Sequence, residues 1–268
     1  MKLTKTLKTA ISTHAKTAYP AECCGLIVQI HGKPTYQPCI NIALTPNDQF
    51  EIDPADWVRL SELGEIQAIV HSHPNGSAEP SEVDRAQMGV HGMDWVICGY
   101  GVHSDEQEYC EIKRHKPTSY LSPLVGREYY HGVQDCYSLV RDYYQRELDI
   151  DLPDFARNEN WWEDENHEPL YQNNFEKAGF VQVHDLQKHD VILCRVGRTE
   201  HINHALVWLG DGSLNSEPVA PVVGDSLILH HPHGALSRRE VFGDSWRRRV
   251  SMVVRHRSLS QVTACQLC

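Results

Sequence analysis

The sequence feature that most constrains the fold is a short apolar run that ends in a pair of histidines. Residues 66–70 read Ile-Gln-Ala-Ile-Val and predict a buried strand, and His-Ser-His-Pro follows directly at residues 71–74. Because side chains alternate along a strand, His71 and His73 point to the same side. Asp84 falls in the first turn of a predicted helix, so its carboxylate can point back toward the end of the strand.

These three side chains are a complete set of protein ligands for a catalytic zinc ion, with a fourth position left for water. The sequence Ser-Glu-Val-Asp at residues 81–84 is also a capping box, which would close a helix N-terminus without any metal. The two interpretations are compatible, because Ser81 can cap the helix while Asp84 binds the metal. Upstream, Glu22 immediately precedes a predicted strand at residues 25–30 and could act as a general base.

Together these residues resemble the JAMM (MPN+) metalloprotease family, whose pattern is an upstream Glu, then H-[ST]-H-P, then S-x-x-D. The resemblance covers roughly residues 1–115. It implies Glu22 as general acid/base, Ser81 as a hydrogen-bond donor to the oxyanion, and cleavage of peptide or isopeptide bonds, often next to a ubiquitin-like fold. The implied ligands of a single zinc ion are His71, His73 and Asp84.

A second group of residues indicates a cysteine nucleophile. Asp135 directly precedes Cys136, and the apolar spacing after them predicts a helix to about residue 146. The partial positive charge at a helix N-terminus lowers the pKa of a thiol, so we expect Cys136 to favour the thiolate. A cysteine simply packed under the helix is the alternative, because free cysteines are often buried.

The base for this thiol is expected to be His204, which lies on a predicted strand in phase with Leu206 and Trp208. His201, in the preceding polar loop, is a competing candidate. A third polar group that orients His204 could come from the end of the next strand. The candidates there are His230 and His231, and we favour His230.

The order Cys, H-x-x-x-x-L-G-D-G and L-H-H resembles the NlpC/p60 cysteine peptidases over roughly residues 127–255. The resemblance implies a papain-like fold, with Cys136, His204 and His230 as catalytic residues, and Tyr129 matches a tyrosine that shapes the site. The family usually reads D-C-S-G after a longer glycine-rich loop, whereas this chain reads Asp-Cys-Tyr-Ser. This departure weakens the expected specificity for peptidoglycan stem peptides.

The chain is expected to form two α+β domains, because helices and strands mix in both halves. The two resemblances imply that these are a JAMM/MPN-like α/β/α domain at residues 1–115 and a papain-like NlpC/p60 domain at residues 127–268. Residues 116–126 carry prolines and serines without apolar periodicity and predict a linker. A strand is also predicted at residues 40–44. The terminal C-x-x-C at residues 265–268 supplies only half of a structural zinc site and is expected in an exposed tail.

Composition limits the partners. The net charge of −11 argues against a nucleic-acid binder, which needs a basic face. No apolar run approaches the roughly 20 residues of a membrane-spanning helix, so no membrane partner is expected. The start of the chain lacks an export signal, and the nine scattered cysteines are expected to be reduced thiols, as in the cytoplasm.

The order of a JAMM domain followed by an NlpC/p60 domain resembles the tail tip assembly proteins of lambda-like bacteriophages. It implies other tail tip proteins as partners, one of them with a ubiquitin-like domain, and assembly in a host cytoplasm, with the virion tail tip as a further location. We rank a protease that matures a tail protein first. A virion-associated endopeptidase that cuts peptidoglycan peptides during host entry comes second, and a structural component with relic sites third.

Overall fold

The structure is a computed structural model that describes residues 1–260. The chain forms two compact units, Met1–Leu121 and Ser122–Cys268. The terminal C-x-x-C motif and the end of the second predicted domain lie outside the described residues. Among residues 1–260, no helix is both long enough and apolar enough to cross a membrane.

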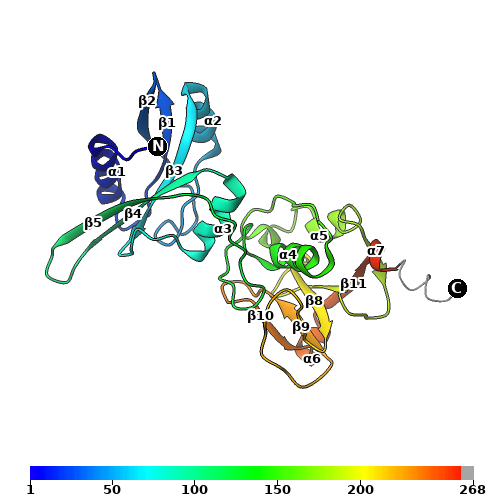
Figure 1. The fold of residues 1–268 in the computed structure, drawn as a ribbon. Coiled ribbons are helices and arrows are strands. Elements are labelled where there is room, and N and C mark those ends of the chain that lie inside the picture. The colour runs from blue at the N-terminus through cyan, green and yellow to red at the C-terminus, as the bar shows by residue number, and fades with distance from the viewer. Residues whose placement is uncertain (261–268) are drawn as a thin grey trace. The chain divides into compact units, whose positions relative to one another are not determined.

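The first unit is built on a five-stranded sheet with the order β2-β1-β3-β4-β5 (Figure 1). Strands β3 and β4 are parallel and are connected through α3, whereas the other neighbours are antiparallel. The strands are β1 (Cys24–Ile30), β2 (Lys33–Cys39), β3 (Glu65–Pro74), β4 (Asp94–Val102) and β5 (Glu108–His115). The helices are α1 (Lys5–Ala18), α2 (Pro54–Leu63) and α3 (Glu82–His91).

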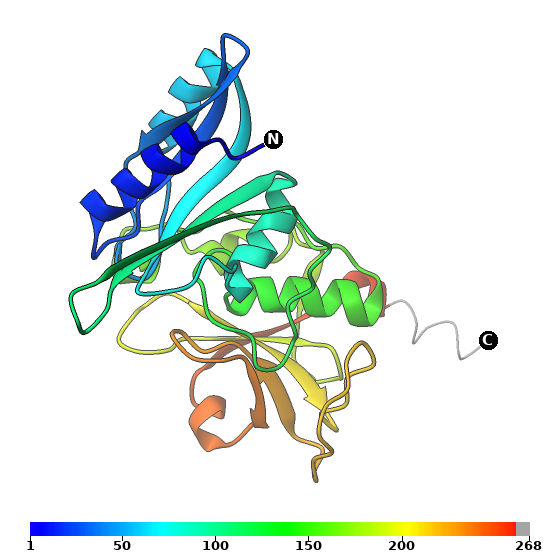
Figure 2. The same cartoon turned by 60° about the vertical axis from the view of Figure 1, so that its left-hand side comes forward.

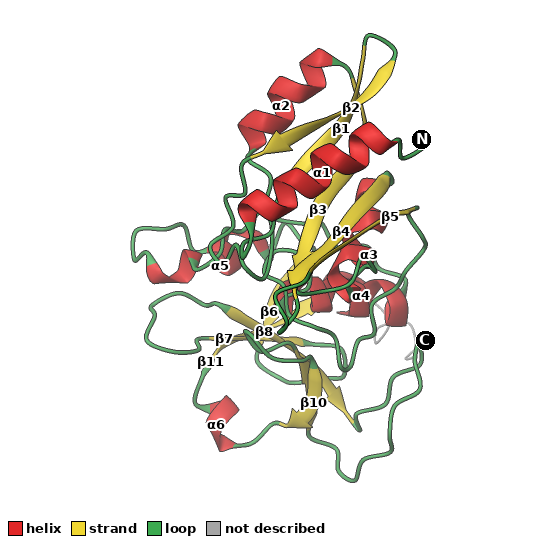
Figure 3. Cartoon of the chain, turned by 90° about the vertical axis from the view of Figure 1, so that its left-hand side faces the viewer, coloured by secondary structure: helices red, strands yellow, loops and turns green. Residues whose placement is uncertain are grey.

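Helices cover both faces of this sheet, because alternate side chains of each strand enter different cores. On one face, Leu7 and Ile11 of α1 pack against Ile27 and other strand residues. On the opposite face, Leu60 of α2 and Met88 of α3 join a separate core. Figures 1 and 3 show α1 and α2 on opposite sides of β1 and β3. The first unit therefore has the predicted α/β/α layers.

The predicted strand at residues 40–44 is wrong. His31 and Gly32 have φ values of 47° and 76°, so the chain turns tightly after β1 and β2 begins at once. Strand β2 carries Pro34 and Pro38, which an edge strand tolerates because its outer side has no partner strand. The Ile and Leu side chains of residues 40–44, which suggested a strand, are exposed in the loop that follows β2.

The second unit contains a six-stranded sheet with the order β10-β9-β8-β7-β11-β6 and antiparallel neighbours throughout. The strands are β6 (Phe180–Val183), β7 (Val191–Cys194), β8 (His204–Gly210), β9 (Leu227–His230), β10 (Arg238–Val241) and β11 (Val250–His256). The helical elements are α4 (Cys136–Leu148), η1 (Trp161–Glu163), α5 (Leu170–Asn174), α6 (Asp244–Arg247) and α7 (Arg257–Ser260).

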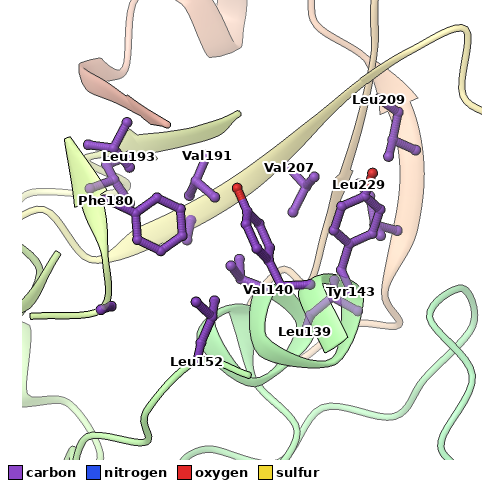
Figure 4. Packing of buried hydrophobic residues seen from close by; sticks show 14 of the residues in the cluster. Leu139, Val140, Tyr143, Leu152, Phe180, Val191, Leu193, Val207, Leu209 and Leu229 are labelled. Carbon is purple, nitrogen blue, oxygen red and sulfur yellow. The ribbon is translucent and has the colours of Figure 1, made fainter. Parts of the chain in front are cut away.

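Helix α4 packs against β8 and β9 of this sheet (Figure 2). Its first residue, Cys136, lies at the start of β8, where its sulfur is 4.0 Å from the Asn203 carbonyl oxygen. Its inner face carries Leu139, Val140 and Tyr143, which are buried against β8 and β9 (Figure 4). Burial of such side chains contributes about 1.5 to 3 kcal/mol each. The packing of α4 on β8 therefore fixes where the predicted nucleophile lies.

A buried ion pair links the residue directly before β7 to β11 in the second unit. The Asp190 carboxylate, completely buried, accepts two hydrogen bonds of 2.8 Å from Arg255. We expect Asp190→Ala to lower the free energy of unfolding by up to about 3 to 5 kcal/mol, because the Arg255 guanidinium would lose its buried counter-ion and keep only the exposed Asp185. Urea denaturation measures this loss.

The matched control is Asp185→Ala, which removes the exposed second partner of Arg255. We expect a much smaller loss of stability, since water screens that pair. Equal losses for the two variants would contradict the importance of the buried pair.

Candidate active sites

His71, His73 and Asp84 converge at one place in the first unit, with ligand atoms all within 4.8 Å of one another. The two Nε2 atoms of the histidines lie 2.9 Å apart. The Asp84 carboxylate approaches His71 Nε2 at 3.4 Å and His73 Nε2 at 3.2 Å. Two imidazole nitrogens and a carboxylate oxygen thus face a common point, as a tetrahedral metal site requires.

The capping box and the cluster coexist. Ser81 Oγ accepts a hydrogen bond from the Asp84 amide at 3.1 Å, and Asp84 Oδ2 accepts one from the Ser81 amide at 2.7 Å. These bonds hold the Asp84 carboxylate at the N-terminus of α3, where it also faces the histidines. Ser81 is exposed at this position, and its hydroxyl hydrogen is still free to donate.

The hydrogen bonding of His73 suits a metal ligand. Its Nδ1 lies 2.9 Å from the Ser77 carbonyl oxygen, which can only accept, so Nδ1 carries the proton. The neutral ring then presents an unprotonated Nε2 to the cluster. His71 is held by stacking on Phe50, with ring centroids 4.5 Å apart. The donor set and the orientation of its atoms therefore fit zinc.

Glu22 is fixed beside this cluster by backbone hydrogen bonds. Its amide donates to the Pro46 carbonyl at 2.6 Å, and its carbonyl accepts from the Asn41 side chain at 3.0 Å. The next amide, that of Cys23, donates to Ser72 Oγ at 2.8 Å, which ties this segment to β3 between the two histidines. The Ser of the His-Ser-His motif thus positions the segment that carries the predicted base.

Burial and charge set the protonation of this group. Burial raises the pKa of Glu22 to about 8, and the charge of Asp84 adds to the rise. Burial also lowers the pKa of His71. Burial opposes ionisation of Asp84 as well, but interactions with both histidines outweigh it and hold its pKa well below the usual range. Near neutral pH Asp84 is charged, and Glu22 can hold or release a proton.

In the second unit, Cys136 and His204 line the same cavity. The Cys136 thiol lies 3.3 Å from the Tyr171 hydroxyl and 4.0 Å from the Asn203 carbonyl oxygen. The amide of Ala205 also interacts with Sγ. Because the residues on both sides of His204 contact the thiol, the start of α4 faces the start of β8.

The expectation that the helix N-terminus favours a Cys136 thiolate is wrong for the protein without substrate. Burial, together with the neighbouring Asp135 carboxylate, raises the pKa of Cys136 to about 11. Asp135 caps α4 through the Ser138 amide and forms a buried ion pair with Arg157, which holds its pKa near 2. Burial, and after it the neighbouring negative charge, outweighs the helix terminus, so the thiol needs a base.

A chain of side chains extends from His204 away from the cavity. His204 Nε2 lies 3.1 Å from His230 Nδ1, and His230 Nε2 lies 3.3 Å from Glu240 Oε2. Glu240 is further held by Arg238 and by the Trp246 indole. Burial lowers the pKa of His204 to about 3 and that of His230 to about 4, while the Glu240 charge opposes both shifts.

The other predicted side chains lie as follows. His231 and Tyr129 line the cavity, with their ring centroids 5.2 Å apart. His201 instead bonds to the Asp164 carbonyl through Nε2 at 2.9 Å and does not line this cavity. The structure thus places His204, rather than His201, on the cavity wall with Cys136, and His230, rather than His231, in hydrogen-bond contact with His204.

Comparison with known proteins places the chain in a family. A model of prokaryotic homologs of the JAB domain matches residues 4–111, and a model of the NlpC/P60 family matches residues 126–255. Tail tip assembly protein K of Escherichia phage N15 is 30% identical over 258 residues, which are 96% of this chain and 97% of that protein. The chain belongs to the tail tip assembly protein K family.

Other relatives of this K family member cover less of the chain. Tail tip assembly protein K of Escherichia phage lambda is 36% identical over 210 residues, which are 77% of this chain and 90% of that protein. A desampylase of Haloferax volcanii is 31% identical over 87 residues, which are 30% of this chain and 63% of that protein. The resemblances drawn from the motifs, and the fold class with its JAB/MPN and NlpC/P60 domains, are confirmed.

The K family structure adds site residues that the motifs did not indicate. Tyr171 reaches the thiol from α5, a helix with too few residues to show apolar periodicity. Arg157 comes from an irregular segment, and Glu240 from a short strand next to β9. Each is brought to the site by tertiary packing, so no local sequence pattern marks it.

We expect Glu240 to influence the ionisation of the Cys136 thiol indirectly, through His230 and His204. Its carboxylate favours protonation of His204, so Glu240→Gln should make His204 a weaker base and Cys136 harder to ionise. We expect the pH midpoint of Cys136 alkylation by iodoacetamide to rise, and the rate at pH 7 to fall roughly threefold to tenfold.

The control is Arg238→Met, which removes a positive charge that lowers the pKa of His230. In this variant the pH midpoint of Cys136 alkylation should fall. Mass spectrometry on each variant, with Cys136→Ala as the blank, measures the profiles. An unchanged profile in Glu240→Gln would show that the carboxylate has no influence on the thiol.

Proposed function

We propose that this tail tip assembly protein hydrolyses peptide or isopeptide bonds at two sites, and that the first is a zinc peptidase that matures a tail protein during assembly. The observation that carries the proposal is the convergence of His71, His73 and Asp84 at the N-terminus of α3. The buried Glu22 beside them has the raised pKa of a group that can both accept and donate a proton near neutral pH.

The residues of the first site would divide the work of hydrolysis. Zinc held by His71, His73 and Asp84 would supply Lewis acidity, which polarises a carbonyl and acidifies water. Glu22 would accept a proton from the attacking water and donate it to the departing amine. The exposed Ser81 hydroxyl would donate a hydrogen bond to the developing oxyanion.

The second site would act by covalent catalysis. His204 would remove the Cys136 proton as sulfur attacks the carbonyl carbon, and would return that proton to the departing amine. Water would then hydrolyse the thioester. His230 would hold the His204 ring through its hydrogen bond to Nε2. Because His204 is a weak base in its buried state, the ion pair would form only with substrate in place.

The proposed setting of this chemistry follows from the family. The partners would be other phage tail tip proteins, and the location would be the host cytoplasm during assembly, with the virion tail tip as a further location. The JAB-domain match keeps a partner with a ubiquitin-like domain, as the motif resemblance implies, as the proposed substrate of the zinc site. The NlpC/P60 match keeps peptidoglycan peptides as the alternative substrate of Cys136 during host entry.

Co-expression with the other tail proteins tests the maturation role. We expect His73→Ala to abolish a cleavage product that the wild-type chain produces, because the ligand set would be incomplete. The control is His103→Ala, which removes a histidine that lies between β4 and β5, and it should leave the product unchanged. Gel electrophoresis with mass spectrometry of each tail protein measures the outcome.

Other outcomes separate the alternatives. A product lost only in Cys136→Ala would assign maturation to the second site, and cleavage of purified cell-wall peptides that depends on Cys136 would favour the entry role. Cleavage products that are unchanged in His73→Ala would contradict the proposed zinc peptidase. Normal tail assembly by the double variant of His73 and Cys136 would favour a structural component with relic sites.

A further inference from the structure

The cavity beside Cys136 is large and its walls are mostly apolar. Its volume is about 420 Å³, which is within the range of ligand-binding pockets. Apolar and aromatic side chains reach it from α4, α5, β6 and β7. Among them are Val140, Phe155, Tyr171, Phe175, Phe180 and Leu193.

The floor of this cavity is the hydrophobic core of the unit. Val140, Phe180, Val191 and Leu193 line the cavity and also belong to the core cluster shown in Figure 4. A group that enters beside the thiol therefore meets core side chains rather than a polar surface. Burial of an apolar group there gains free energy, whereas burial of an unpaired charge costs it.

Among the described residues, the cavity lining offers no arginine or lysine that is free of an ion pair. Arg157 is the one arginine or lysine among the described residues that line it. Its guanidinium donates to both oxygens of Asp135, at 2.6 and 3.0 Å, and to Asp154 at 2.9 Å. It also donates to the Phe155 carbonyl and the Ser138 hydroxyl. A substrate carboxylate that entered the cavity would find no arginine or lysine there that lacks an acidic partner.

We propose that Cys136 accepts an acyl donor whose side chains next to the scissile bond are large and apolar, as in a hydrophobic segment of a protein. This inference rests on the proposed cysteine peptidase function. Peptides that carry free carboxylates next to the bond, as peptidoglycan stem peptides do, match the cavity poorly. The occupant is an acyl donor because the nucleophile Cys136 and the base His204 open into the same space.

Peptidyl chloromethyl ketones that differ in one side chain test this preference on the full chain. The Cys136 thiolate displaces chloride, so that a carbon–sulfur bond forms as the carbon–chlorine bond breaks, and the proton passes to His204. We expect probes with Phe or Leu to label Cys136 at least about tenfold faster than probes with Glu or Lys. Intact-mass spectrometry measures the rates, with Cys136→Ala as the blank.

A variant that fills the cavity sharpens the test. Ala178→Leu places a larger side chain in the lining and should reduce the advantage of the Phe probe by several-fold. Val207→Ile changes the same core cluster away from the cavity and should preserve the advantage. The comparison among probes on the wild-type chain stands even if Ala178→Leu fails to fold.

The outcomes distinguish the inference from the function on which it rests. The apolar preference would be overturned if all peptidyl probes labelled Cys136 at equal rates, or if the Glu probe labelled it faster. Labelling of Cys136 by iodoacetamide in the same protein would show that the nucleophile is intact. Absence of Cys136 labelling by every reagent would overturn the cysteine peptidase and the inference together.

Discussion

The parallel pairing of β3 and β4 is the constraint on which the first site depends. A parallel pair needs a crossover, and α3 provides it, so the chain must leave the end of β3 and enter a helix nearby. His71 and His73 lie at that strand end, and Asp84 lies in the first turn of that helix. The topology thereby brings the three side chains together and buries His71 and Asp84.

The second site depends in the same way on the packing of α4 across β8. Burial has opposite effects on the two partners, since it raises the pKa of Cys136 and lowers that of His204. Both groups are therefore neutral at rest. His204 is hydrogen-bonded to His230, and the Glu240 carboxylate next to His230 supplies negative charge that can stabilise an imidazolium when a substrate arrives. In both sites, therefore, buried ionisable side chains are held in position by hydrogen bonds and ion pairs to neighbouring residues.

The sequence allowed the local parts of this structure to be predicted. The alternation at residues 66–74, the cap before α3 and the Asp before Cys136 each act over a few residues, and their geometry follows from strand and helix periodicity. The prediction of a strand at residues 40–44 was wrong because it assumed that the apolar side chains there are buried, whereas they are exposed. The tight turn at His31 and Gly32 shifted pairing to a segment with two prolines.

Features that depend on tertiary packing were not accessible in this way. Glu240 reaches His230 only because β10 lies beside β9, and Tyr171 reaches Cys136 only through a helix of a single turn. The raised pKa of Cys136 likewise depends on burial, which no spacing rule reveals. Helix termini favour thiolates in general, but a carboxylate in the preceding residue and low solvent access reverse the effect here.

The most direct test of the account is elemental analysis of the full chain purified without chelators. We predict about one zinc ion per chain, lost in His71→Ala and retained in His103→Ala, since the structure forms one cluster with this donor set among residues 1–260. Wild-type protein without zinc after such purification, or zinc that persists in His71→Ala, would contradict a metal centre at His71, His73 and Asp84.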